Sequence, residues 1–169
     1  MNNAPISTGQ AVQFSADALK QAETIFNRYP PEHKLSALLP LLDLAQREFG
    51  GWLSQEAMDY VATLVDAAPI RVYEVATFYT MYNLKPVGKY HVQICTNISC
   101  WLCGSDAISA AVKEKLELQF GQSSEDGRFT LTEVECLGAC VNAPMLQIND
   151  DYYENLTPES VVGVIDGLA

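Results

Sequence analysis

The spacing of hydrophobic positions divides the chain into two parts. In the first part, apolar residues recur every three or four positions in four segments, the pattern of amphipathic helices. Pro40 lies inside the second segment and predicts a kink or a late helix start there. Boundary signals flank the segments, namely N-capping serines, helix-ending pairs of Pro or Gly and a first-turn proline: Ser15, Ser54, Pro30-Pro31, Gly50-Gly51 and Pro69. We therefore expect a helical bundle over residues 15–86, preceded by a flexible tail over residues 1–14.

In the second part, the hydrophobic period falls from 3.6 to 2. Tyr90, Val92 and Ile94 alternate with polar residues, which predicts a strand that ends at Cys95. The other expected elements are a helix from Ser105 or Asp106, strands near residues 129–134, 146–148 and 152–153, and a last helix from Thr157. The order β-α-β-β-β-α predicts a thioredoxin-like α/β domain with a mixed sheet over residues 87–169. The expected fold class is thus α+β, a helical bundle followed by that domain.

Composition and charge narrow the classes of function. The 169 residues carry a net charge of −11, which argues against nucleic acid as a partner, because phosphate binding needs a basic face. No apolar run is long enough to cross a bilayer, so direct membrane insertion is not expected. The first fourteen residues lack the basic and apolar regions of a secretory signal, which favours a cytoplasmic location. Thiols there stay reduced and serve metal or redox chemistry more often than disulfides.

Two cysteine pairs dominate the candidate chemistry. Cys95-x4-Cys100 and Cys136-x3-Cys140 each begin where a predicted strand ends. If the two strands are neighbours in the sheet, their ends bring four sulfurs to one edge. A [2Fe–2S] cluster needs four thiolates, two on each iron, so the pattern predicts one such cluster and one-electron transfer.

Other uses of these cysteines stay open on sequence grounds. Structural zinc sites also use paired cysteines, although with spacings that these pairs barely match, so a zinc-binding interaction module is an alternative. Cys100-Trp-Leu-Cys103 imitates the active site of a thioredoxin-type thiol oxidoreductase, but that interpretation leaves the other three cysteines without a role. We expect Cys103 to be a small, half-buried residue of the first helical turn and no ligand.

Further motifs accompany the cysteine pairs in a fixed order: Gly51-Trp52-Leu53, Val75-Ala76-Thr77-Phe78-Tyr79, Gly127-Arg128-Phe129-Thr130 and Ala143-Pro144. With them, the chain from about Ser15 to Leu168 resembles the E subunits of bacterial NADH:quinone oxidoreductases, the small iron–sulfur subunits of the complex I flavoprotein module. The resemblance implies that Cys95, Cys100, Cys136 and Cys140 hold one [2Fe–2S] cluster.

The same resemblance implies an enzyme complex in which this chain is an electron carrier without a substrate site. Its partners would be a flavoprotein subunit that binds NADH and FMN and other peripheral-arm subunits of complex I. The cluster would take an electron from reduced FMN, and the complex would hold the chain at the inner face of the bacterial cell membrane. Related subunits serve NAD-linked hydrogenases and formate dehydrogenases, which remain alternatives.

Two further expectations concern binding surfaces. Phe78, Tyr79 and Tyr82 fall near one stripe of the fourth helix, and we expect them to be core residues or contacts of the flavoprotein subunit. The sequence contains no Gly-rich loop of the kind that holds phosphates, so NADH and FMN are expected in the partner subunit only.

Overall fold

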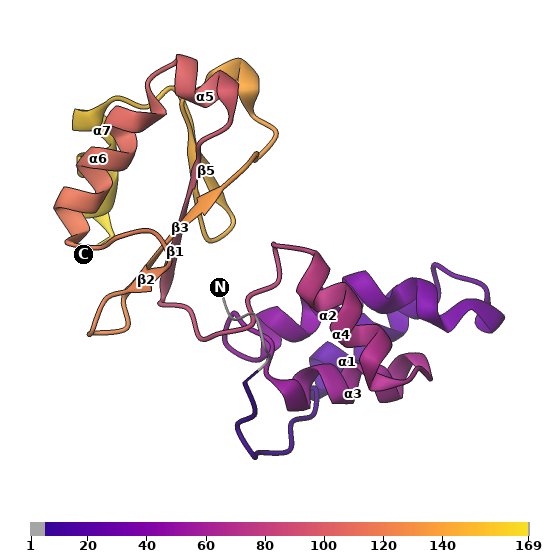
Figure 1. Cartoon of the computed structure of the whole chain (residues 1–169). Coiled ribbons are helices and arrows are strands. Elements are labelled where there is room, and N and C mark those ends of the chain that lie inside the picture. The colour runs from indigo at the N-terminus through magenta and orange to yellow at the C-terminus, as the bar shows by residue number, and fades with distance from the viewer. Residues whose placement is uncertain (1–5, 169) are drawn as a thin grey trace. The chain divides into compact units, whose positions relative to one another are not determined.

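The computed structural model describes residues 6–168, and the chain forms two compact units (Figure 1). The first unit spans Met1–Pro86 and consists of helices, and the second spans Val87–Ala169 and contains a five-stranded mixed sheet. This confirms the predicted α+β fold class. No helix within residues 6–168 is both long and apolar enough to cross a membrane.

The helical unit follows the boundary signals of the sequence. Its elements are α1 (Ala16–Phe26), η1 (Pro31–Ala37), α2 (Leu38–Glu48), α3 (Gln55–Val65) and α4 (Pro69–Phe78). Ser15 and Ser54 cap α1 and α3, because each side chain accepts a hydrogen bond from the backbone N–H three residues later. Pro40 lies in the first turn of α2, where its missing N–H breaks no helical hydrogen bond. The late helix start expected at Pro40 is therefore what the structure shows.

The helices of this unit all contribute apolar side chains to one hydrophobic core. Leu41, Leu42, Leu53, Met58 and Val72 are among its fully buried side chains. Burial of each such side chain contributes roughly 1.5–3 kcal/mol relative to exposure, which is why short helices hold together here.

The aromatic stripe at the end of α4 divides into a buried and an exposed part. Tyr82 is buried, and its hydroxyl donates to the Leu39 carbonyl at 2.9 Å. Phe78 and Tyr79 remain 76% and 40% exposed. Of the three aromatic residues, only Tyr82 thus belongs to the core.

Residues 6–14 differ from the flexible tail expected for residues 1–14. Phe14 is buried and stacks on Phe49 with ring centroids 5.6 Å apart. The Glu56 carboxylate accepts hydrogen bonds from the Ser7 hydroxyl and from the Thr8 and Gly9 backbone N–H groups, and these hold the pKa of Glu56 well below its usual range. These partners are distant in the sequence, so local sequence does not show the contacts. Residues 1–5 of that segment lie outside the described residues.

The second unit is built on one sheet with the strand order β2-β3-β1-β4-β5. Its strands are β1 (Tyr90–Cys95), β2 (Gln122–Ser123), β3 (Phe129–Val134), β4 (Leu146–Ile148) and β5 (Asp151–Tyr153). β1 and β3 are parallel, whereas the other neighbouring strands are antiparallel. A parallel pair needs a helical crossover, and the helices between β1 and β3 provide it.

Helices α6 (Ser105–Leu116) and α7 (Pro158–Gly167) pack against one another beside this sheet (Figure 1). Val92, Ile94 and Leu131 of the sheet share a core with Ile108 of α6 and Val161 of α7. A capping box between Thr157 and Ser160 fixes the predicted start of α7. The sequence pattern missed α5 (Ile98–Leu102), the short strand β2 and η2 (Cys140–Asn142).

Gly88 and Gly163 generate a paired prediction about stability. A Cβ at Gly88 would lie 2.8 Å from backbone atoms of Phe129, whereas a Cβ at Gly163 meets nothing within 4 Å. Gly88→Ala is expected to lower the free energy of unfolding by about 1–3 kcal/mol, because a backbone cannot move aside cheaply. Gly163→Ala should raise it by about 0.5–1 kcal/mol, because Gly is costly inside a helix. Urea unfolding of both variants measures this, and a Gly88→Ala protein as stable as the wild type would contradict it.

Candidate metal centre

The pairing of β1 with β3 places the two cysteine loops at one edge of the sheet. Cys95, the last residue of β1, lies in register with Val134, the last residue of β3. The Thr96 N–H extends the pairing by donating to the Val134 carbonyl at 3.1 Å. Cys136 follows two residues later, so both loops leave the sheet at its carboxyl end, where Figure 1 shows α5. The two strands are thus neighbours in the sheet, which is the condition for bringing the two cysteine loops to one edge.

The first cysteine pair is buried and in contact. Cys95 and Cys100 are 2% and 1% exposed and share a small cluster with Met145. Asn97 caps α5 by accepting from the Ile98 N–H at 2.7 Å, and this short helix carries Cys100 back over the end of β1. Burial, followed by a hydrogen bond with the Cys95 sulfur, raises the pKa of Cys100 to about 11.

The second cysteine pair lies on an exposed loop. Cys136 and Cys140 are both exposed. Gly138, between them, has φ of +80°, and this left-handed conformation lets its N–H donate to the Cys136 Sγ at 3.3 Å. The Tyr152 hydroxyl donates to the Leu137 carbonyl of the same loop at 2.7 Å. Small residues and a backbone N–H that donates to a sulfur are typical of sites that hold a negatively charged cluster.

The structure brings the four cysteines only partly together. Cys95 and Cys100 share a buried cluster, whereas Cys136 and Cys140 lie on the exposed loop. Within residues 6–168, however, no group of three or more His, Cys, Asp or Glu side chains is placed to hold a metal ion. The four-ligand site therefore stays a prediction.

The donor chemistry of these residues fits a cluster. All four candidate ligands offer sulfur, and the two pairs follow neighbouring strands. Metal binding supplies the free energy that draws such ligands into one site. Cys136 and Cys140 are exposed and therefore accessible to a metal.

Cys103 differs from the expectation of a half-buried residue in the first helical turn. It is exposed and forms the C-cap of α5, ahead of the next helix. The reason is the helix α5, which the sequence pattern missed. The geometry also disfavours a thioredoxin-type reaction, since Cys100 is buried with a raised pKa, whereas a nucleophilic thiol needs access and a lowered pKa.

Exposed apolar side chains occur in both cysteine segments. Ile98, Trp101 and Leu102 on α5 and Val141 on η2 are 66%, 54%, 72% and 96% exposed. We call these four residues the loop rim. Large apolar side chains that are exposed to this extent next to candidate ligands make these segments candidates for an interaction site. Sequence reasoning missed the rim, although the apolar residues between and beside the cysteines were its visible signal.

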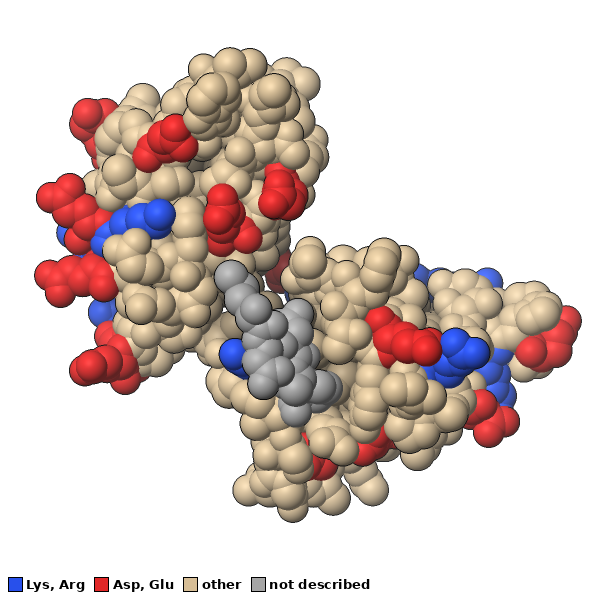
Figure 2. All heavy atoms as spheres, viewed as in Figure 1, with Lys and Arg blue, Asp and Glu red and all other residues tan. Residues whose placement is uncertain are grey.

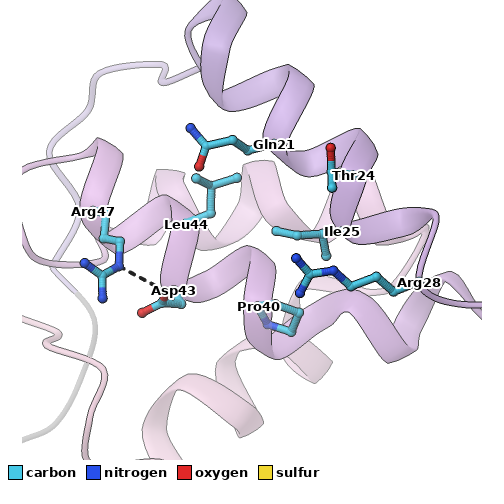
Figure 3. Close-up of a pocket in the computed structure, with 8 residues that line it drawn as sticks. All are labelled: Gln21, Thr24, Ile25, Arg28, Pro40, Asp43, Leu44 and Arg47. Atoms are coloured by element: carbon cyan, nitrogen blue, oxygen red, sulfur yellow. Dashed lines mark hydrogen bonds and ion pairs between the residues drawn. The ribbon is translucent and has the colours of Figure 1, made fainter.

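The helical unit contains a surface hollow. It has a volume of about 350 Å³ and lies between α1 and α2 (Figure 3). Ile25, Pro40 and Leu44 contribute apolar surface, and Arg47 forms an ion pair with Asp43 at 3.1 Å on its edge. In the part of the chain that the structure describes, its lining includes none of the cysteines, so it is separate from the candidate metal chemistry.

The surface charge follows the composition. Acidic residues outnumber basic ones by 21 to 10, and Figure 2 shows carboxylates distributed over the visible face rather than gathered in one patch. Such a distribution marks no single charged patch on that face.

Comparison with known proteins shows the family. A model of the thioredoxin-like [2Fe–2S] ferredoxin family matches residues 22–169. The chain therefore belongs to the thioredoxin-like [2Fe–2S] ferredoxin family, the class that the fold and the paired cysteines define.

Relatives within the family carry a more specific name. The NADH-quinone oxidoreductase E subunit of Rickettsia bellii is 58% identical over 155 residues, which cover 92% of this chain and 93% of that protein. The mitochondrial NADH dehydrogenase [ubiquinone] flavoprotein 2 of Dictyostelium discoideum is 51% identical and covers 90% of this chain, which spans 62% of that protein. These similarities confirm the resemblance to the E subunits of NADH-quinone oxidoreductases.

A solved structure supports the fold. An NAD⁺-reducing [NiFe]-hydrogenase in the air-oxidised state aligns with 78% of this chain at a TM-score of 0.67 and 21% identity. The chain spans 22% of that hydrogenase chain. At this identity the likeness concerns the fold alone.

His91, on the strand that leads to Cys95, generates a prediction about pH. Burial lowers the pKa of His91 to about 4, and its Nε2 bonds the Thr132 hydroxyl at 2.9 Å. The unfolded chain, with an ordinary pKa of 6.5, then binds the proton first as the pH falls. The stability that His91 contributes is thus full above pH 6.5 and falls by about 3 kcal/mol between pH 6.5 and pH 4.

Urea unfolding at several pH values measures this effect. His91→Gln should flatten the decline between pH 6.5 and 4, while His33→Gln, at an exposed position, serves as the control and should keep it. An unchanged pH dependence in the His91 variant would show that another group is responsible.

Proposed function

We propose that this chain is an electron-transfer subunit that holds one [2Fe–2S] cluster on Cys95, Cys100, Cys136 and Cys140. The observation that carries the proposal is the parallel, in-register pairing of β1 and β3, which directs both cysteine loops to one sheet edge. Family membership and the relatives from NADH-quinone oxidoreductases support the cluster type.

A cluster bound there would supply one-electron chemistry, and the protein would control its surroundings. Cys95 and Cys100 provide a buried side, where water is excluded by Met145. Cys136 and Cys140 provide the side that faces solvent or a partner. The Gly138 N–H already points at a ligand sulfur, so negative charge on that sulfur meets a donor. An electron would therefore enter and leave the cluster on the side of Cys136 and Cys140, which is exposed.

The proposed electron donor is reduced FMN in a partner subunit that binds NADH. The relatives named as subunits of NADH-quinone oxidoreductase support this assignment, and other subunits of the peripheral arm of complex I are proposed as further neighbours. Through that assembly the chain would lie at the inner face of the bacterial cell membrane. A place in an NAD-linked hydrogenase or formate dehydrogenase is the alternative within the same chemistry.

The loop rim is the proposed docking surface for that flavoprotein subunit. Its exposed apolar side chains border the exposed cysteines, and electron transfer needs the donor close to the cluster. Trp101 is held in place because its indole N–H donates to the Asp106 carboxylate at 2.9 Å. A fixed aromatic residue with apolar neighbours is typical of the centre of an interface.

A cysteine series tests the ligand set. We expect the anaerobically purified chain to contain two irons and two acid-labile sulfides, and to give one spin-half EPR signal after reduction. Cys95→Ser and Cys136→Ser should each lose most of the iron–sulfur absorption, because the cluster loses a thiolate. Cys103→Ser is the matched control and should keep it, since Cys103 caps α5 on the outside.

The outcomes separate the competing functions. A colourless chain that holds one zinc ion would support the interaction module instead. A colourless chain that reduces disulfides through Cys100 would support a thiol oxidoreductase. Loss of the cluster in Cys103→Ser would overturn the assignment of four ligands.

A second prediction concerns docking. Leu102→Asp places a charge on the loop rim and is expected to weaken association with the flavin-containing subunit about tenfold, while the cluster content stays unchanged. Leu19→Asp, at a residue of α1 with 47% exposure, is the control for a new surface charge. Isothermal titration calorimetry with the purified partner subunit measures the affinity of each variant. Equal affinities of the wild type and Leu102→Asp would remove the rim from the interface.

A further inference from the structure

The loop with the second cysteine pair is fastened to the chain segment that follows β4. We call residues 152–156 the clamp segment. Three of its hydrogen bonds hold the far end of the loop: Asn142 Nδ2 to Glu154 Oε2 at 2.9 Å, Asn155 N to the Asn142 carbonyl at 2.8 Å and Leu156 N to the Pro144 carbonyl at 3.1 Å. The fourth is the bond from the Tyr152 hydroxyl to the Leu137 carbonyl at 2.7 Å.

The Tyr152 bond differs from the other three because of the peptide group that it reaches. The Leu137 carbonyl and the Gly138 N–H are the two ends of one peptide group. That N–H donates to the Cys136 Sγ at 3.3 Å. The Tyr152 hydroxyl, this peptide and the Cys136 sulfur therefore form a continuous chain of two hydrogen bonds.

Hydrogen bonds in such a chain strengthen one another. A donor that binds a carbonyl oxygen polarises the peptide and makes its N–H a stronger donor, by about 10–30% per bond. A stronger N–H bond to a ligand sulfur stabilises the more negative, reduced state of an iron–sulfur cluster and so raises its reduction potential. Groups that act on a metal through a ligand in this way are part of the site even without touching the metal.

We propose that Tyr152 is a positioning residue that raises the reduction potential of the cluster by polarising the 137–138 peptide toward the Cys136 sulfur. This inference rests on the proposed function, because it requires a cluster bound through Cys136. The redox step itself adds one electron to the oxidised cluster and forms or breaks no bond. Dithionite supplies that electron in a redox titration.

The tuning role can be separated from a structural one. The Tyr152 ring is 48% exposed, so the hydroxyl is its main link to the loop. Removal of the hydroxyl alone leaves the three other clamp hydrogen bonds in place. Tyr153 lies on the same strand, and no residue within 6–168 bonds its hydroxyl, so Tyr153→Phe is a matched control.

The test is an EPR-monitored redox titration of the full chain with its cluster. At a fixed ambient potential, Tyr152→Phe is expected to show a roughly threefold lower ratio of reduced to oxidised cluster, the order that loss of such a polarising bond produces. For a one-electron couple this ratio corresponds to a midpoint about 28 mV lower. Iron content should stay that of the wild type, and Tyr153→Phe should keep the wild-type midpoint.

A second variant keeps the inference testable if Tyr152→Phe fails to bind a cluster. 3-Fluorotyrosine at position 152 keeps the ring and has a more acidic hydroxyl, so it should donate more strongly and shift the midpoint upward. Opposite shifts in the two variants support the inference. A wild-type midpoint in the fluorotyrosine variant, or in a fully loaded Tyr152→Phe chain, overturns the role of Tyr152 and leaves the proposed function intact. A wild-type chain that takes up no cluster overturns both.

Discussion

The parallel hydrogen bonding between β1 and β3 is the constraint on which the rest of the candidate site depends. Because Cys95 and Val134 end their strands in register, both cysteine loops begin at the same sheet edge. The crossover that parallel strands require contains α5 and α6, and α5 carries Cys100. A shift in the register of β3 would move Cys136 away from Cys95 and separate the two pairs.

The two cysteine pairs have opposite environments, and this asymmetry gives the site its proposed use. One pair is nearly inaccessible, which protects a redox centre from water, and the other is exposed beside apolar side chains. The exposed loop depends on the clamp segment for its position, since its own backbone forms only a short 3₁₀ turn. In such a centre, the buried pair would shield the cluster from water, and the exposed pair would face a partner protein.

Much of this arrangement could be predicted from sequence because the signals were local. Ser54 and Pro69 mark helix starts by their own side chains, and the alternation before Cys95 marks a strand. The features that were missed depend on distant contacts or on short elements. The anchoring of residues 6–14 requires Phe49 and Glu56, which no local pattern connects to them. The helix α5 has five residues, too few for a hydrophobic period to appear.

The four-sulfur site itself depends on the approach of Cys136 to the buried pair, and iron X-ray absorption of the anaerobically isolated chain tests that claim most directly. Each iron is expected to have four sulfur neighbours and one iron neighbour at short range. An iron with nitrogen or oxygen ligands, or a sample whose metal is zinc, would contradict it.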